Sequence, residues 1–155
     1  MVKIFLISHG PFSKGLLESI EMIAGPQEGI TSLSLERGEN PEEFRNRLQE
    51  SLSENYDATN GVLVLCDLKG GTPYNSAAYL SQKFKMKLIT GMNVPMVITL
   101  VTTRTAETSL DELATLATSS ESTNIENVNL NFKQGGRKHG KLSLKIGRAS
   151  CRERV

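Results

Sequence analysis

The sequence has little net charge and few aromatic residues. It contains 18 Lys and Arg against 17 Asp and Glu, which leaves a formal net charge of +1, and it has no Trp. This nearly equal number of positive and negative side chains argues against a nucleic-acid or anionic-membrane surface. The scarcity of aromatic rings argues against platforms on which bases stack. We therefore expect no nucleic-acid partner.

Long apolar runs and cysteine motifs are missing as well. The longest apolar stretch, near residues 94–101, is far too short to span a bilayer. The N-terminal MVKIFLIS turns polar too quickly for a signal peptide. Cys66 and Cys151 lack CxxC or metal-ligand spacing, which favours a reducing, cytoplasmic compartment. Without a cluster of His, Cys and acidic residues or a Walker motif, we expect no metal and no cofactor.

The length of 155 residues is typical of one domain. We expect a folded domain at residues 1–133 and a disordered tail at 134–155, since disorder is common at chain termini. Residues 146–155 are polar, basic and aperiodic, so they are interpreted as non-native sequence and are left out of the fold prediction.

Within the domain, apolar runs alternate with segments of helical period. The pattern predicts strands at 2–8, 30–36, 61–67 and 85–91, helices at 14–25, from Pro41 onward, at 72–84 and around 110–117, and a short late strand at 128–132. Residues 94–103 fit either a helix or a strand, and Pro95 near the start favours a helix. This alternation predicts an α/β fold, with a doubly wound, mainly parallel sheet and helices on both faces.

His9 and Asp67 stand at the carboxyl ends of the first and third predicted strands. Doubly wound sheets bind ligands beyond these ends, where the strand order reverses. If these two strands flank that point, the two side chains emerge together. A neutral imidazole can act as a nucleophile, and a carboxylate that accepts a hydrogen bond from one ring N–H fixes its tautomer. We expect about 2.6–3.2 Å between the two groups.

The segment GGTP at residues 70–73 predicts an anion site. Gly70 and Gly71 permit a tight turn and a close approach of the backbone. Thr72 is expected to cap the helix that Pro73 starts, and a helix N-terminus with free N–H groups binds anions.

Each of these features also has a simpler interpretation. A lone histidine is more often structural, Asp67 could equally be a capping or loop carboxylate, and GGTP alone is a turn and a helix cap. In combination, a nucleophilic histidine, an orienting carboxylate and an anion cradle predict phosphoryl transfer on His9.

Three segments, SHGPFSKGLLES, DLKGGTPYNSA and GMNVPM, resemble in order and spacing the IIA component of the bacterial phosphoenolpyruvate-dependent sugar phosphotransferase system, mannose-fructose-sorbose class. The resemblance covers residues 1–133. It implies that His9 accepts a phosphoryl group from the phosphocarrier protein HPr and passes it to a IIB component, with membrane IIC and IID subunits acting downstream. It also places the family's aspartate at Asp67 and its hydroxyl residue at Thr72.

The same resemblance implies an additional antiparallel C-terminal strand and a homodimer, sometimes formed by exchange of that strand. Many relatives carry a fused IIB domain, whereas this sequence ends without one and is expected to be a separate IIA polypeptide.

Three other functions remain open at this stage. One is the phosphotransfer subunit of a dihydroxyacetone kinase system, which the segment GGTPYN fits less well. Another is a IIA-like regulatory domain that binds other proteins. The third, a flavodoxin-like small-ligand binder, would require His9 and Asp67 to lie far apart.

A phosphoryl carrier that exchanges with other proteins needs an accessible site. We therefore expect a shallow site with an apolar rim rather than a deep pocket. Phe12, Met92 and Pro95 are the candidate rim residues, since each lies in or beside a loop at a strand end.

Overall fold

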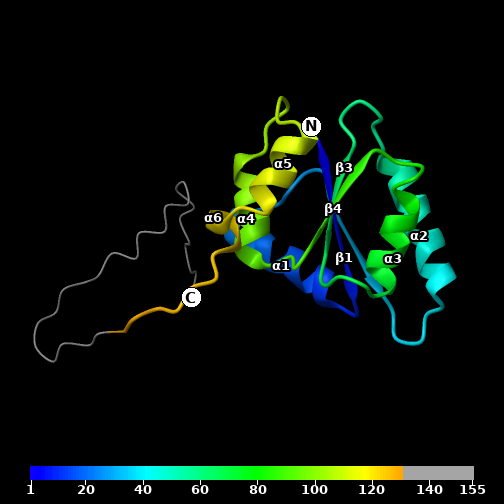
Figure 1. The fold of residues 1–155 in the computed structure, drawn as a ribbon, viewed down its shortest axis with the longest axis horizontal. Coiled ribbons are helices and arrows are strands. Elements are labelled where there is room, and N and C mark those ends of the chain that lie inside the picture. Colours follow the sequence, from blue (N-terminus) through cyan, green and yellow to red (C-terminus); the bar gives the residue numbers. More distant parts are fainter. Residues whose placement is uncertain (131–155) are drawn as a thin grey trace, which may run out of the picture.

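A parallel four-stranded sheet organises the chain in a computed structural model that describes residues 1–130 (Figure 1). The elements in chain order are β1 (Lys3–His9), α1 (Phe12–Ala24), β2 (Ile30–Leu35), α2 (Pro41–Asn55), β3 (Val62–Cys66), α3 (Thr72–Leu80), β4 (Met86–Thr90), α4 (Val94–Thr103), α5 (Leu110–Ala117) and α6 (Ser120–Thr123). The α/β fold predicted from the sequence is confirmed, and 94–103 is a helix.

The strand order β2-β1-β3-β4 reverses direction between β1 and β3. All three strand pairings are parallel, and Ile7 of β1 lies opposite Cys66 of β3. The carboxyl ends of β1 and β3 are therefore neighbours at the switch point. This is the arrangement that brings His9 and Asp67 together.

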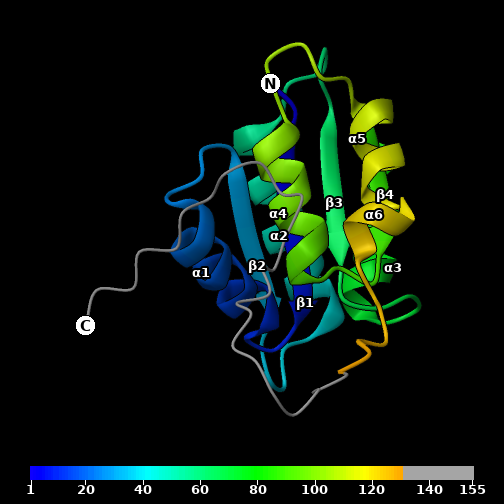
Figure 2. The same ribbon diagram turned by 90° about the vertical axis from the view of Figure 1, so that its left-hand side faces the viewer.

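Helices cover both faces of the sheet, α1, α4 and α5 on one side and α2 and α3 on the other (Figures 1 and 2). Alternate residues of each strand point to opposite faces. Thus Leu63 and Leu65 of β3 pack with the first group of helices, whereas Val62, Val64 and Cys66 pack against α2 and α3. Since β3 is buried on both faces, its end is held firmly in place.

Helix starts follow local capping chemistry in most cases. Asn40 caps α2 and Asn93 caps α4 through side chains that accept backbone N–H groups. Ser109 and Glu112 form a capping box at α5. The cap predicted at Thr72 is wrong: the N-cap of α3 is Gly71, and Thr72 is the first helical residue.

Most boundaries agree with the sequence prediction to within two residues, but two elements differ by more. Helix α3 ends at Leu80 rather than near Phe84, because the chain turns there and the Phe84 ring packs edge-on against Tyr56 at a centroid distance of 5.1 Å. In the predicted strand at 128–132, residues 128–130 adopt neither helix nor strand. The rest of that segment and the tail predicted at 134–155 lie outside the described residues.

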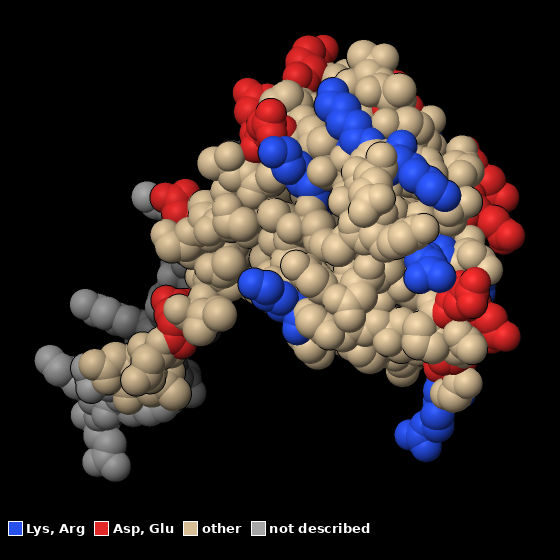
Figure 3. Space-filling model, turned by 45° about the vertical axis from the view of Figure 1, so that its right-hand side comes forward, with Lys and Arg blue, Asp and Glu red and all other residues tan. Residues whose placement is uncertain are grey.

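The distribution of charged side chains on the surface agrees with the nearly zero net charge of the sequence. Across the face in Figure 3, Lys and Arg side chains are spread among uncharged residues, with Asp and Glu towards the edges. Charge of both signs is therefore distributed rather than gathered into one strongly acidic or basic patch on this face.

Among residues 1–130, no helix is long and apolar enough to cross a bilayer.

Candidate functional site

His9 is the last residue of β1, and a tight turn follows it. Gly10 has a φ of +54°, a left-handed conformation that suits glycine, and its N–H donates to the carbonyl of Leu35 at 2.9 Å. The buried Ser8 hydroxyl accepts the N–H of Ser13 at 2.7 Å, so it satisfies the start of α1, where Pro11 offers no side-chain cap. His9 is thereby fixed between a strand and a capped helix.

The carboxylate of Asp67 binds His9 in two ways. Its Oδ2 lies 2.8 Å from the ring Nδ1 of His9 and accepts the His9 backbone N–H at 2.9 Å. Its Oδ1 accepts the N–H of Leu68 at 2.8 Å and lies 3.4 Å from the Sγ of Cys66. With Nδ1 protonated to donate to the carboxylate, the lone pair is on Nε2.

These contacts also determine the charge state of Asp67. Partial burial opposes ionisation of the carboxyl group, but the hydrogen bonds from the backbone and ring of His9, from Leu68 and from Cys66 outweigh it. The pKa of Asp67 is lowered as a result. The carboxylate therefore stays ionised near neutral pH and can stabilise positive charge on the His9 ring.

The glycine pair brings the start of α3 against the other edge of the His9 ring. A Cβ atom at Gly71 would lie 2.7 Å from His9 Nε2 and would also collide with Cε1. Gly70 makes the preceding turn with a φ of +92°, and the Asn75 side chain donates to its carbonyl at 3.3 Å. Nε2 thus faces the N-terminus of a helix, with no side chain at position 71 between them.

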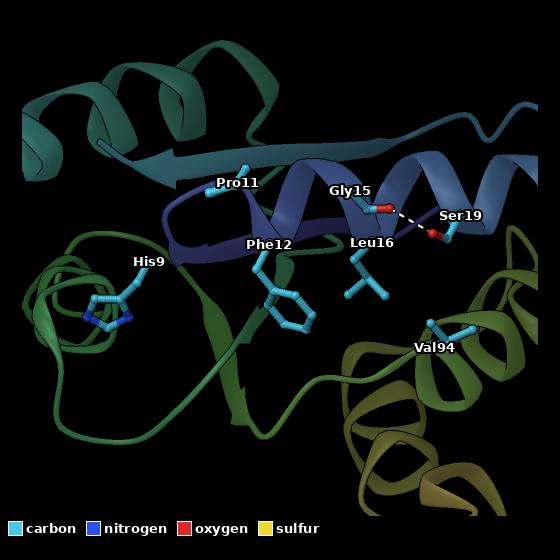
Figure 4. A pocket seen from close by; sticks show the side chains of 7 residues that line it. All are labelled: His9, Pro11, Phe12, Gly15, Leu16, Ser19 and Val94. Carbon is cyan, nitrogen blue, oxygen red and sulfur yellow. Dashed lines mark hydrogen bonds between the residues drawn. The ribbon is translucent and has the colours of Figure 1, made fainter. Parts of the chain in front are cut away.

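An open groove of about 410 Å³ runs from His9 along α1 to α4. Figure 4 shows Phe12 and Leu16 of α1 and Val94 of α4 along this groove, with His9 at one end. The residue Phe12 is 45% exposed, and the side chain of His9 is 43% exposed. The site is shallow and has an apolar wall, as expected.

One predicted rim residue is misplaced. Met92 is only 4% exposed and packs in the core with α1 and α4, so it presents no docking surface. The reason is that its N–H bonds to the carbonyl of Cys66 at 3.1 Å, which keeps residue 92 beside the sheet. Pro95, in the first turn of α4, is partly exposed beside Val94.

A second groove, of about 460 Å³, lies on the other side of His9. The loop after β2 forms its far wall with Glu36, Arg37, Gly38 and Glu39. An ion pair between Glu39 and Arg47 braces this loop, with 2.6 Å between Oε1 and Nη1. Sequence reasoning missed this wall, although the loop also follows the carboxyl end of a strand and could have been found by that rule.

The structure therefore brings His9 against Asp67 and Gly71. Gly70 and Thr72 adjoin Gly71 at the start of α3. Phe12 lines the groove beside His9, whereas Pro95 is not among the lining residues and only follows Val94, which is one of them. The contact between His9 and Asp67 removes the premise of the small-ligand binder, which required them to be far apart. Among residues 1–130, no three His, Cys, Asp or Glu side chains are grouped as metal ligands.

Comparison with known proteins gives a consistent result. The family described as "PTS system fructose IIA component" matches residues 3–118. The mannose-specific EIIAB component of the phosphotransferase system from Escherichia coli (strain K12) is 34% identical over 117 residues, which cover 75% of this chain and 36% of that protein. The chain thus matches about a third of that relative's length.

Two further relatives are close to this chain in length. The fructose-specific EIIA component from Bacillus subtilis (strain 168) is 29% identical over 67% of this chain and 71% of its own length. The crystal structure of the phosphotransferase system component EIIA from Streptococcus agalactiae superposes with a TM-score of 0.73 and 32% identity, over 82% of this chain and 97% of that one.

Proposed function

The chain belongs to the fructose IIA component family of the sugar phosphotransferase system, and we propose on that premise that it is a phosphohistidine carrier. In this proposal His9 accepts a phosphoryl group from phosphorylated HPr and passes it to a IIB component. The membrane IIC and IID subunits would use the phosphoryl group downstream, during sugar uptake.

The observation that carries the proposal is the orientation of the His9 ring. Asp67 occupies Nδ1 at 2.8 Å, so Nε2 is the nucleophilic nitrogen. The ring is 43% exposed, which lets a phosphorylated side chain of another protein approach it. A fixed carboxylate that orients the ring and selects its tautomer supports a nucleophilic role for His9.

The transfer step follows from this orientation. The Nε2 lone pair attacks the phosphorus of the donor's phosphohistidine, an N–P bond forms, and the donor's own N–P bond breaks with its electron pair returning to the donor ring. The proton on His9 Nδ1 stays in place and donates to Asp67, whose negative charge stabilises the now cationic ring. Transfer to the IIB acceptor is the same step with His9 as the leaving group.

The N-terminus of α3 supports the phosphoryl oxygens in this proposal. The N–H groups of Thr72 and Tyr74 lie in the first helical turn, where no intrahelical acceptor exists. Pro73 between them has no N–H to lose. The Thr72 hydroxyl, being in the first turn rather than at the cap, is available as a further donor. A dianionic group on Nε2 would thus meet a helix dipole of favourable sign.

The grooves beside His9 suit protein partners. We propose that docking proteins contact Phe12, which is substantially exposed in the apolar groove, and Pro95, which is partly exposed next to the groove residue Val94. We also propose that the protein is cytoplasmic and that it forms a homodimer. Sedimentation of the purified chain would test the homodimer.

The test is phosphoryl transfer from phosphorylated HPr to the wild type and to His9→Ala. We expect the wild type to be labelled and His9→Ala to take up no phosphoryl group while it keeps its unfolding midpoint, since the ring is half exposed. The control is His139→Ala, the other histidine of the chain, which should be labelled normally. Labelling of His9→Ala at the wild-type rate would reject His9 as the acceptor.

A further inference from the structure

The Oδ1 atom of Asp67 has a donor that the proposed mechanism does not use. Of the two groups that contact it, one is the backbone N–H of Leu68 at 2.8 Å. The other is the thiol of Cys66, with 3.4 Å between Sγ and Oδ1, an ordinary length for a hydrogen bond from sulfur. The Leu68 carbonyl also lies 3.4 Å from Sγ.

The thiol is suited to donate rather than to react. Cys66 is the last residue of β3 and is fully buried. Burial, aided by the neighbouring carboxylate of Asp67, raises the pKa of the Cys66 thiol to about 12. The sulfur therefore keeps its proton, and an ionised carboxylate attracts that proton more strongly than a neutral carbonyl does.

Packing alone does not call for a thiol at this position. Val62, Val64 and Cys66 form one row on the face of β3 that packs against α2 and α3. A third small apolar side chain would continue the row. The sequence instead places the one side chain of similar size that also carries a weak donor, next to the carboxylate that holds His9.

From this geometry we propose that Cys66 is a positioning residue, whose thiol donates to Asp67 Oδ1 and fixes the plane of the carboxylate that orients His9. The inference deepens the proposed function and rests on it for its effect on transfer. With the thiol in place, both oxygens of Asp67 are held, Oδ2 by His9 and Oδ1 by Leu68 and Cys66. Without it, Oδ1 retains the Leu68 contact alone, and the carboxylate gains freedom to turn.

Three substitutions separate the donor from the volume of the side chain. Cys66→Ser keeps a donor, Cys66→Val removes it with slightly greater bulk, and Cys66→Ala removes it with less bulk. Two signals are read by NMR without any partner protein: the pKa of the Asp67 carboxyl group and the tautomer of the His9 ring from its nitrogen shifts. Phosphoryl transfer from phosphorylated HPr is measured in parallel, and thermal unfolding reports on folding.

We expect the Val and Ala variants to raise the Asp67 pKa, because a donor to the charged form is lost. They should also reduce the fraction of His9 protonated at Nδ1 and slow transfer about three- to tenfold, the range that one modest hydrogen bond supplies. Cys66→Ser should stay close to the wild type in all three.

Equal behaviour of the Ser, Val and Ala variants, or an unchanged Asp67 pKa in both variants that lack the donor, would overturn the proposal. Failure of the wild type to accept a phosphoryl group would instead reject the proposed function. In that case the two NMR signals, which need no transfer, still decide the role of Cys66. Should one variant fail to fold, the remaining one without a donor carries the comparison with Cys66→Ser.

Discussion

Replacement of Gly71 by Ala tests the contact between the His9 ring and the start of α3. The backbone of Gly71 has a φ of −86°, which any residue adopts without strain. The new methyl group, however, would lie 2.7 Å from His9 Nε2, whereas non-bonded heavy atoms prefer about 3.5–4.0 Å. The ring must therefore move by about 1 Å or turn away from Asp67.

This displacement should affect transfer far more than stability. The ring is the end of a flexible side chain and is 43% exposed, so it can swing towards solvent at little cost to folding. Misplacement of a reacting group by about 1 Å can cost on the order of a hundredfold in rate. We expect Gly71→Ala to fold like the wild type and to accept phosphoryl groups about a hundred times more slowly.

Gly70→Ala is the matched control, one residue away and opposite in mechanism. No atom lies within 4 Å of a Cβ at Gly70, but its φ of +92° is unfavourable for any other residue. This variant should lose about 1–2 kcal/mol of unfolding free energy and retain most of its transfer activity under conditions where it is folded. The assay is urea unfolding together with single-turnover labelling by phosphorylated HPr. Transfer by Gly71→Ala at the wild-type rate would refute the role given to this contact.

Two further predictions concern Asp67 and its neighbours. Asp67→Asn removes the charge that stabilises the cationic ring and can hold the wrong tautomer, so the rate of transfer should fall on the order of a hundredfold or more. Thr72→Ala removes one neutral hydroxyl and should reduce the rate less. If the labelling rates rank the other way, the carboxylate of Asp67 is structural. Because the folded-state pKa of Asp67 is lowered, its stabilisation is present above its ordinary value of about 3.9 and is lost as pH falls through the folded value. Unfolding midpoints measured from pH 5 to 2.5 should therefore fall less steeply for Asp67→Asn than for the wild type, and parallel curves would contradict this linkage.

The sequence was sufficient to predict the central pair of the site. Strand–helix alternation implied a parallel sheet, and the rule on strand ends then placed His9 and Asp67 at one edge. The distance of 2.8 Å between Nδ1 and Oδ2 in the structure falls in the expected range. What made this prediction possible is topology: the identity of two strand ends was enough, and no side-chain packing had to be known.

Predictions that depended on finer detail were less successful. Capping at Thr72 was wrong because Gly71 takes the cap position, a shift of one residue that local sequence preferences do not resolve. Met92 turned inward because a backbone bond to Cys66 sets the course of its loop. The sequence did not indicate the contact between the Cys66 thiol and Asp67, since a cysteine at the end of an apolar strand is expected to be a core residue.

The way Asp67 is held explains how an exposed histidine can be a well-oriented one. Two of its four donors are backbone N–H groups, those of His9 and Leu68, located where β1 and β3 end. The sheet itself therefore positions the carboxylate, and the carboxylate positions the ring from its Nδ1 side. Nothing needs to close over Nε2 to keep it oriented. In the proposed function, the same nitrogen can therefore face one protein to receive a phosphoryl group and another to give it up.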